Sequence, residues 1–386
     1  MKSTKEKNKS MSKRTPGQRF TAVMVLAFAY VGVLVGAGFA SGQEILQYFV
    51  AHGVWGIVGA VVSIFFFALT GMILLQIGSK YNSNSHGDAL RHIASPKIGK
   101  FLDISIMLTL IILGIVMIAG AGSNLEQQFG LPLWFGSALC AAAIILVSFM
   151  DTNKVIGVIS VVTPVLILFV MGSAIYSIAH AQASVSELVS EASLIRPATP
   201  NWLLSALNYL AFNLMTGASM AIVMGGDEEK PKVAGRGGFI GGALIGIMIV
   251  LVSLALLFQI REVAGEDMPL LALIDLIHPA LGALMSLVLY LMIFNTGLSV
   301  FYSFVSRLAP NESKKFNMVM IVCVIIAFIV SFVGFKTLLS FFYPLIGYVG
   351  FALIIVLLSR WLKNTHRRMK IAKDDSNDLG FFDTKI

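Results

Sequence analysis

Long apolar stretches, separated by short polar segments, run through almost the whole chain. The stretches lack the strict alternation of a β-strand, and each is long enough to cross about 30 Å of hydrocarbon as a helix. They fall at residues 19–50, 54–78, 101–122, 133–149, 155–179, 202–224, 239–259, 281–306, 317–334 and 337–359. The pattern therefore predicts an all-α polytopic membrane protein with about ten transmembrane helices.

The composition supports this class and excludes several others. Of the 386 residues, 57% are hydrophobic and 12% are charged, with a mean hydropathy of +0.86. A soluble domain has about 25% charged residues, so a soluble enzyme, a disordered chain and a collagen are excluded. Cys140 and Cys323 both fall inside apolar stretches. They form neither a disulfide framework nor a metal-ligand set, and we expect them to pack between helices.

Lysine and arginine are distributed unevenly among the predicted loops. If residues 1–18 face the cytoplasm, the loops on the other side hold three of the 28 basic residues, namely Arg196, Arg261 and Lys336. The positive-inside rule then places both termini in the cytoplasm and the protein in the cell membrane. The same topology accounts for the net charge of +8, so the expected partners are a lipid bilayer and a small-molecule substrate, and no nucleic acid.

The same pattern predicts three parts of the chain. A basic cytoplasmic tail covers residues 1–18, a ten-helix domain covers 19–359, and a second cytoplasmic tail covers 360–386. The second tail is basic up to Lys373 and then acidic. We expect it to be solvated and mobile.

The first apolar stretch contains a segment poorly suited to an uninterrupted helix. Its middle reads GVLVGAGFASGQE from Gly32 to Glu44. Each glycine costs a helix about 1 kcal/mol relative to alanine, and backbone freed from helical bonding persists in a membrane only where it lines a cavity. We therefore predict two half-helices. The alternative is that the pairs Gly32/Gly36 and Gly38/Gly42, four residues apart, let neighbouring helices pack closely.

The sixth apolar stretch carries a similar polar interruption. It reads YLAFNLMTGASMAIVMGG from Tyr209 to Gly226. If ten helices divide into two sets of five, the first and sixth correspond, and the second set enters the membrane from the opposite side. Paired broken helices at such positions mark the central site of a transporter. The sequence thus predicts a 5+5 inverted repeat, about 19–179 and 202–359, with helices 1 and 6 broken.

Three motifs carry a resemblance to a known family. GAGFASGQE at 36–44, TGAS at 216–219 and GGDEEKPK at 225–232 resemble the amino acid–polyamine–organocation superfamily with the leucine-transporter fold, in particular its YkvI-like bacterial membrane proteins. The resemblance covers about 20–359. It implies secondary active transport driven by sodium or protons. The substrate would lie between the broken first and sixth helices, flanked by the third and eighth.

The resemblance also implies which residues bind substrate. In the first helix, backbone amides of the matching segment would bind a substrate carboxylate, and in the sixth, freed carbonyls would take the amine while side chains line the pocket. Ser41 belongs to the same polar part of the first break. Phe39 and Phe212 could act as apolar lids, or could simply pack. The expected substrate-binding residues are Gly36, Ala37, Gly38, Phe39, Ser41, Phe212, Asn213, Thr216, Gly217 and Ala218.

Glu44 is the carboxylate that lies deepest in an apolar stretch, whereas Asp103 stands at the start of the third. An intramembrane acid is costly and therefore marks a functional site by default. Glu44 could carry a coupling proton, or it could cap the loosened backbone from Gly38 to Gly42. No lysine or arginine stands in the middle of a predicted span to pair with it.

Thr296 and Ser299 form a candidate sodium site in the eighth stretch. They are three residues apart and so share a helix face, at the depth where the resemblance implies two hydroxyl ligands. Relatives usually carry adjacent hydroxyls, whereas Val300 follows Ser299 here. Alternatively, the two hydroxyls bond their own helix backbone. Apart from Na⁺, we expect no cofactor.

These patterns together predict a secondary active transporter and not an enzyme, since neither HExxH nor GxSxG occurs. The predicted substrate is a small zwitterionic solute, with an amino acid as the leading candidate, moved by alternating access with Na⁺ or H⁺. The alternative is a passive channel, or a membrane sensor that binds solute without moving it. Polarity concentrated at two breaks favours the transporter.

Overall fold

The computed structural model describes residues 15–82, 95–149, 162–180, 185–310 and 313–380. Within these ranges the regular structure is helical, with no strand. The predicted tail up to residue 14, the start of the fifth span at 155–161 and residues 381–386 lie outside the described residues. The helices are α2 (Pro16–Leu34), α3 (Ala37–Ser41), α4 (Gln43–Tyr48), η1 (Val50–His52), α5 (Gly53–Tyr81), α7 (Pro96–Phe129), α8 (Leu133–Ser148), α10 (Val162–Ala179), α11 (Val185–Ala192), α12 (Trp202–Gly226), α13 (Pro231–Phe258), α14 (Ile260–Val263), α15 (Pro269–Ile277), α16 (Pro279–Val305), α17 (Lys314–Ser331) and α18 (Phe335–Gly380).

Several helices begin where a polar side chain accepts the free amides of the first turn. At α2, Thr15 accepts from the amide of Gln18, and the Gln18 side chain accepts from the amide of Thr15. At α12, the Asn201 side chain accepts from Leu203 and Leu204. These local contacts place the helix starts close to where the apolar stretches begin.

The described chain has eight helical segments long and apolar enough to cross a membrane. Two shorter apolar helices, Leu133–Ser148 and Ile167–Ala179, accompany them. The predicted all-α polytopic architecture is therefore confirmed. The count of ten crossings and the limits of the two repeats stay predictions.

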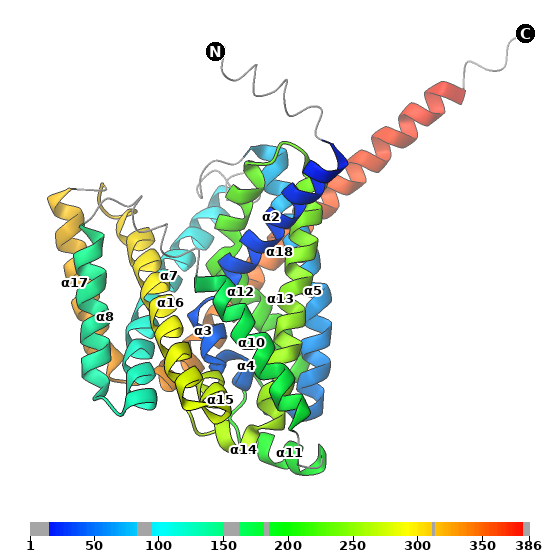
Figure 1. Cartoon of the computed structure of the whole chain (residues 1–386). Coiled ribbons are helices and arrows are strands. Elements are labelled where there is room, and N and C mark those ends of the chain that lie inside the picture. Colours follow the sequence, from blue (N-terminus) through cyan, green and yellow to red (C-terminus); the bar gives the residue numbers. More distant parts are fainter. Residues whose placement is uncertain (1–14, 83–94, 150–161, 181–184, 311–312, 381–386) are drawn as a thin grey trace, which may run out of the picture.

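The helices form two groups, with the short helices α3 and α4 of the broken first span between them (Figure 1). One group contains α2, α5, α12 and α13, and the other contains α7, α8, α16 and α17. The short helices α3 and α4 lie between the groups: α3 packs on α16 and α15, while α4 packs on α13, α12 and α18. The centre of the molecule is thus built around residues 37–48.

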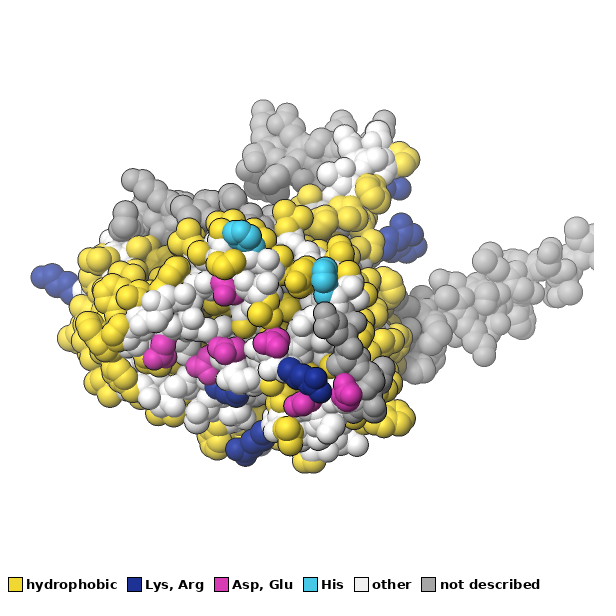
Figure 2. All heavy atoms as spheres, turned by 60° about the horizontal axis from the view of Figure 1, so that its bottom comes forward, with side chains coloured by type: hydrophobic (Ala, Val, Ile, Leu, Met, Phe, Trp, Pro, Cys, Tyr) yellow, Lys and Arg dark blue, Asp and Glu magenta, His cyan; other side chains and the backbone are white. Residues whose placement is uncertain are grey.

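The start of α2 and the end of α18 lie at the same end of the bundle, and α11, α14 and α15 lie at the opposite end (Figure 1). Figure 2 shows acidic side chains gathered on that opposite end, with few basic ones among them. Arg261, predicted to lie on this side, contacts Glu187 and Glu191 of α11 at 3.7 and 3.4 Å. Lys336 donates to the carbonyl of Ala264. Two of the three basic residues predicted for this side thus lie here, and the orientation of the termini stays a prediction.

The predicted break in the first helix is observed. Helix α2 ends at Leu34, and Gly36 has extended backbone angles (φ −96°, ψ −174°). Gly42, between α3 and α4, has φ +82°, a left-handed conformation that glycine adopts without steric cost. A side chain there would also meet the Leu270 amide, 2.8 Å from the added Cβ. Glycine is thus required at position 42 by both its conformation and its packing.

The predicted break in the sixth helix is wrong, because α12 is continuous from Trp202 to Gly226. Its polar side chains bond their own helix: Asn213 Nδ2 donates to the Tyr209 carbonyl, and Thr216 Oγ1 donates to the Asn213 carbonyl. Gly217 packs closely, since an added Cβ would lie 2.2 Å from Leu34 Cδ2. Asn213 and Thr216 therefore have partners within α12, and Gly217 has its neighbour on α2, without any unwinding of the helix.

Closely spaced glycines bring α13 against its neighbours. An added Cβ on Gly238 would lie 2.1 Å from the carbonyl oxygen of Gly71 on α5, and one on Gly242 would lie 2.1 Å from that of Phe67. Gly241 makes the same kind of approach to Ala27 of α2. Small residues let helices approach until their backbones touch, which favours association inside a membrane.

The tail beyond residue 360 is helical up to residue 380, and its mobility stays a prediction. Helix α18 continues without interruption to Gly380, and it projects from the bundle in Figure 1.

Candidate functional site

The candidate site is the space around the break, where α3 and α4 meet α12. Position 36 is open, since no atom outside its own local backbone lies within 4 Å of a Cβ added to Gly36, and the same holds at Gly32. These two glycines therefore do not mediate close helix packing. Gly38 differs, because an added Cβ would lie 1.8 Å from Glu44 Oε1. The Glu44 carboxylate thus occupies the space beside Gly38.

Glu44 reaches from α4 toward α12. Its Oε2 accepts a hydrogen bond of 2.9 Å from the Tyr209 hydroxyl. The side chain is 5% exposed, whereas Ile45 and Leu46 beside it on α4 are 0% exposed. Of the two roles predicted for Glu44, capping of the backbone finds no support, because within the described ranges no backbone amide donates to its carboxylate.

An aromatic cluster surrounds this carboxylate. The ring of Tyr209 lies 5.0 Å from that of Tyr48 and 5.4 Å from that of Phe49. Phe212, one turn further along α12, stacks on Tyr343 of α18 at 4.2 Å and 22°. In this structure Phe212 is therefore a packing residue, and a lid role for it stays a prediction.

A second buried hydrogen-bond chain runs beside the first. The Tyr48 hydroxyl donates to Asn208 Oδ1 at 3.1 Å, and Asn208 Nδ2 donates to the carbonyl of Pro344 at 3.0 Å. Pro344 stands inside α18. These two hydrogen bonds therefore join the second half of the broken helix to α12 and α18. Such buried networks hold their members rigidly when every partner is satisfied.

The other predicted residues of the first break are buried and locally bonded. Ala37 and Phe39 are 2% and 1% exposed. Ser41 Oγ donates to the Gly38 carbonyl at 2.7 Å and accepts from the Gln43 amide at 3.1 Å. Ser41 thus stabilises the junction between α3 and α4, and a role for it in substrate binding stays a prediction.

The structure brings part of the predicted sixth-helix set to the break. Gly217 contacts Leu34, the last residue of α2, and Thr216 beside it is half-buried. Asn213 and Ala218 are each 4% exposed. These side chains can line a pocket, but the helical hydrogen bonding of α12 leaves no freed carbonyls there to bind an amine.

The candidate sodium ligands Thr296 and Ser299 both lie on α16, which packs on α3. Thr296 is half-buried and Ser299 is exposed. Within the described residues, no hydrogen bond joins either hydroxyl to the first-helix break, nor to the carbonyls of α16 itself. Their assignment as ligands stays a prediction.

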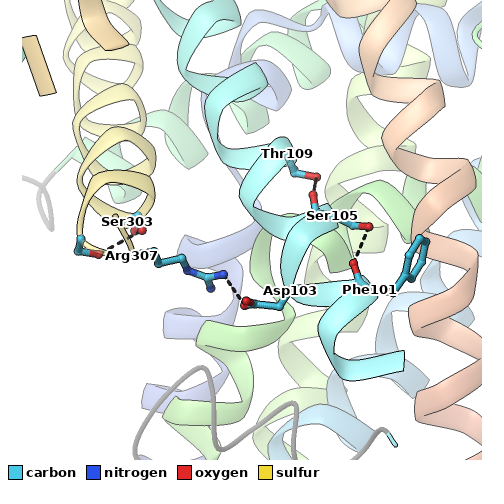
Figure 3. Close-up of polar contacts among 7 residues, drawn as sticks. Phe101, Asp103, Ser105, Thr109, Ser303 and Arg307 are labelled. Carbon is cyan, nitrogen blue, oxygen red and sulfur yellow. Dashed lines mark hydrogen bonds and ion pairs between the residues drawn. The ribbon is translucent and has the colours of Figure 1, made fainter. Parts of the chain in front are cut away.

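Asp103, the other acid near an apolar span, has a cation beside it. Its Oδ1 lies 2.6 Å from Arg307 Nη1, and Figure 3 shows the two side chains pointing toward one another from α7 and from the turn after α16. Ser306, next to Arg307, donates to the Ser303 carbonyl. Asp103 is thus an ion-pair partner that joins two helices at their ends, a role unlike that of Glu44.

The sequence interpretation missed Tyr209, Tyr48, Asn208 and Tyr343. A signal for Tyr209 was present, because it stands four residues before Asn213 and so shares its helix face. Tyr48 likewise stands four residues after Glu44. No comparable local signal exists for Asn208 or Tyr343. Asn208 bonds to Tyr48 and Pro344, which lie 160 and 136 positions away, and Tyr343 stacks on Phe212 of another helix.

Comparison with solved structures defines the class of the fold. Mhp1, a nucleobase-cation-symport-1 family transporter in a closed conformation with bromovinylhydantoin, matches with a TM-score of 0.58 and 14% identity, over 86% of this chain and 77% of that one. MhsT in complex with L-phenylalanine matches with a TM-score of 0.54 and 15% identity, over 86% and 85%. A manganese transporter of Eremococcus coleocola matches with a TM-score of 0.50 and 15% identity, over 81% and 70%. The chain thus has the leucine-transporter fold.

Comparison with curated sequences gives particular relatives. The chain is a homologue of the Uncharacterized membrane protein YkvI of Bacillus subtilis (strain 168), with 29% identity over 336 residues, which are 87% of this chain and 95% of YkvI. The Uncharacterized protein YyaD of the same organism is 26% identical over 338 residues, 86% of this chain and 96% of YyaD. No family model matches the chain. The resemblance to YkvI-like membrane proteins is confirmed, and the chain is a multi-pass membrane protein.

Proposed function

We propose that the chain is a secondary active transporter that moves a small zwitterionic solute, an amino acid in the first instance, by alternating access coupled to H⁺ or Na⁺. The observation that carries this proposal is the break in the first helix beside the buried carboxylate of Glu44. Irregular backbone at membrane depth is stable where it lines a site, and discontinuous helices mark the substrate sites of transporters.

The orientation of the chain belongs to the same proposal. Both ends of the described chain lie at one end of the bundle (Figure 1). In the sequence, the basic residues concentrate in the loops that the apolar pattern assigns to the side of the termini. The positive-inside rule then places the termini in the cytoplasm of a cell membrane. The end covered by α11, α14 and α15 faces outward.

Contacts at the outward end support alternating access. The segment before α15 is bound to α7, because Met268 and Gln127 exchange two hydrogen bonds and Ser123 donates to Asp267 at 2.7 Å. The start of α15 packs on Gly42. This segment therefore covers the break from the outward end, whereas position 36, on the other side of the break, is open.

Uptake into proteoliposomes tests the proposal. The full chain is reconstituted and offered a panel of labelled amino acids, with sodium and proton gradients imposed separately. We expect accumulation of at least one solute against its gradient, dependent on one of the two ions. Equal flux with and without a gradient, and no accumulation, would instead indicate a passive channel. Binding without flux would indicate a sensor.

A further inference from the structure

We propose that Glu44 binds the ammonium group of the transported solute, and that solute and proton exchange at this one carboxylate. The inference rests on the proposed transport function and deepens it by naming the chemical class of the substrate, which is a compound with a primary amine. It also replaces the expectation that the sixth helix takes the amine.

Glu44 is a buried carboxylate and therefore needs a positive partner. A buried carboxylate is stable when it is paired with a cation or protonated. Asp103 has Arg307 at 2.6 Å, but no lysine, arginine or histidine of the described chain forms an ion pair with Glu44. Since no described residue supplies a cation, a proton or a cationic ligand is left to neutralise the Glu44 carboxylate.

The two oxygens of the Glu44 carboxylate differ in their surroundings. Oε2 is held by the Tyr209 hydroxyl at 2.9 Å. Oε1 lies against Gly38, and among the described residues nothing donates a hydrogen bond to it. A carboxylate accepts hydrogen bonds on both oxygens. Oε1 is thus available to a donor that enters beside the break, where position 36 is open.

The sixth helix does not offer the amine site that its sequence predicts. Because α12 is continuous, the carbonyls at its middle are engaged in helical bonds, and those of Tyr209 and Asn213 also accept from side chains. An ammonium group has three donors and no acceptor. Among the described groups at the break, Glu44 is the acceptor that offers both negative charge and an unengaged oxygen.

The side chains around Glu44 suit an organic ammonium group better than an alkali ion. The groups around Glu44 are largely aromatic: Tyr209 and Tyr48 adjoin each other at 5.0 Å, and Phe212 and Tyr343 stack at 4.2 Å. Aromatic faces attract organic cations electrostatically, while an alkali ion needs a shell of oxygen ligands. The surroundings therefore favour an ammonium group on a carbon skeleton.

The titratable groups that face Glu44 are tyrosines. They are Tyr48 on the same helix, Tyr209 on α12 and Tyr343 on α18. Helix α3 and residues 239–258 of α13 contain no titratable side chain, η1 contributes His52, and α15 contributes Asp275, which accepts from Gln128. Solute and proton therefore compete for the carboxylate of Glu44. When R–NH₃⁺ binds to protonated Glu44, one proton is released, and when the solute leaves, one proton is taken up.

The experiment uses the purified full chain in detergent and three matched sets of probes. These are L-amino acids, the amines formed by removal of their carboxyl group, and the acids formed by removal of their amino group. Thermal protection and proton release in weakly buffered solution are measured from pH 5 to 9. We expect protection by amino acids and amines but not by the deaminated acids, with release of up to one proton per bound solute.

Four variants complete the test. Glu44→Gln should lose at least tenfold in affinity and all proton release, and Tyr209→Phe should lose about tenfold. Glu44→Asp, which keeps the charge but shortens the reach, should bind more weakly and still release protons. The matched control is Tyr290→Phe, because Tyr290 donates to Gly136 away from the break, and it should bind like the wild type.

Three outcomes would overturn the proposal. They are wild-type affinity and proton release in Glu44→Gln, equal protection by deaminated acids, and protection by Na⁺ alone that disappears in Glu44→Gln. None of these removes the transport function, since accumulation in proteoliposomes is measured separately. Loss of accumulation in the wild type, with binding and proton release intact, would remove the transport function and leave the ammonium site standing.

Discussion

Gly38 and Glu44 share one space at the centre of the molecule. A Cβ added to Gly38 would lie 1.8 Å from Glu44 Oε1 and 2.7 Å from its carboxyl carbon. The clashing atoms are the far end of a flexible side chain, so the carboxylate can move away while the helices stay in place. The glycine therefore keeps the carboxylate at the break, and it is not needed to bring two helix backbones together.

The first prediction follows from that contact. Gly38→Ala should displace the carboxylate from Tyr209 and reduce solute affinity by tenfold or more, and Gly38→Leu should abolish binding, while both proteins still insert and fold. Gly172→Ala is the matched control, because nothing lies within 4 Å of its added Cβ. Affinity is read from thermal protection by solute. Wild-type affinity in Gly38→Leu would remove the assignment of the site to this break.

The second prediction concerns the contact between α13 and α5. An added Cβ on Gly238 would lie 2.1 Å from the backbone oxygen of Gly71, and backbone cannot move away as a side chain can. Gly238→Ala should therefore destabilise the protein by about 1–3 kcal/mol, the usual cost of overpacking. A lowered melting temperature in detergent checks this. The Gly172→Ala protein should melt at or above the wild-type temperature, since alanine favours helix by about 1 kcal/mol.

The third prediction concerns Asn208. Replacement by leucine leaves the Tyr48 hydroxyl and the Pro344 carbonyl without their hydrogen-bond partner on α12. A buried polar group left unpaired costs about 1–3 kcal/mol, so the melting temperature should fall. Ser205 on the same helix is also 0% exposed, and its hydroxyl has no hydrogen-bond partner among the described residues. Ser205→Ala removes a buried hydroxyl that has no partner, so it should leave the melting temperature unchanged or raise it.

The fourth prediction tests the candidate sodium site. If Thr296 and Ser299 bind Na⁺, Thr296→Ala and Ser299→Ala should each raise the sodium concentration needed for half-maximal uptake, by about tenfold or more, because each removes one oxygen ligand. Uptake at saturating sodium should change less. Sodium dependence identical to that of the wild type in both variants would assign the coupling to another ion or another site.

The fifth prediction concerns the ion pair of Asp103 and Arg307. The side chains are 50% and 22% exposed, so water and salt screen their attraction. A double-mutant cycle with Asp103→Asn and Arg307→Gln should give a coupling energy below about 1 kcal/mol, and the coupling should decrease further at high salt. A coupling of several kcal/mol would show that the pair is shielded from solvent.

Local sequence patterns predicted the first break correctly. Gly36 and Gly42 stand where the chain leaves helical geometry, and the polar residues Ser41 and Glu44 are concentrated at the same place. In the sixth span the same kinds of residue led to the wrong prediction of a break. Asn213 and Thr216 have their hydrogen-bond partners along α12, and Gly217 packs on Leu34. Whether a glycine breaks a helix or packs it depends on the neighbour it meets, and that neighbour comes from a distant part of the chain.

The membrane class, the apolar stretches and the uneven distribution of charge follow from local sequence alone, because they depend on each residue's own transfer free energy between water and lipid. Packing of the helices was needed to show that α12 is unbroken, that Tyr209 holds Glu44, and that Asp103 has a cation beside it while Glu44 has none among the described residues. Those contacts join residues more than 150 positions apart. They depend on how the helices pack against one another, which local periodicity does not encode.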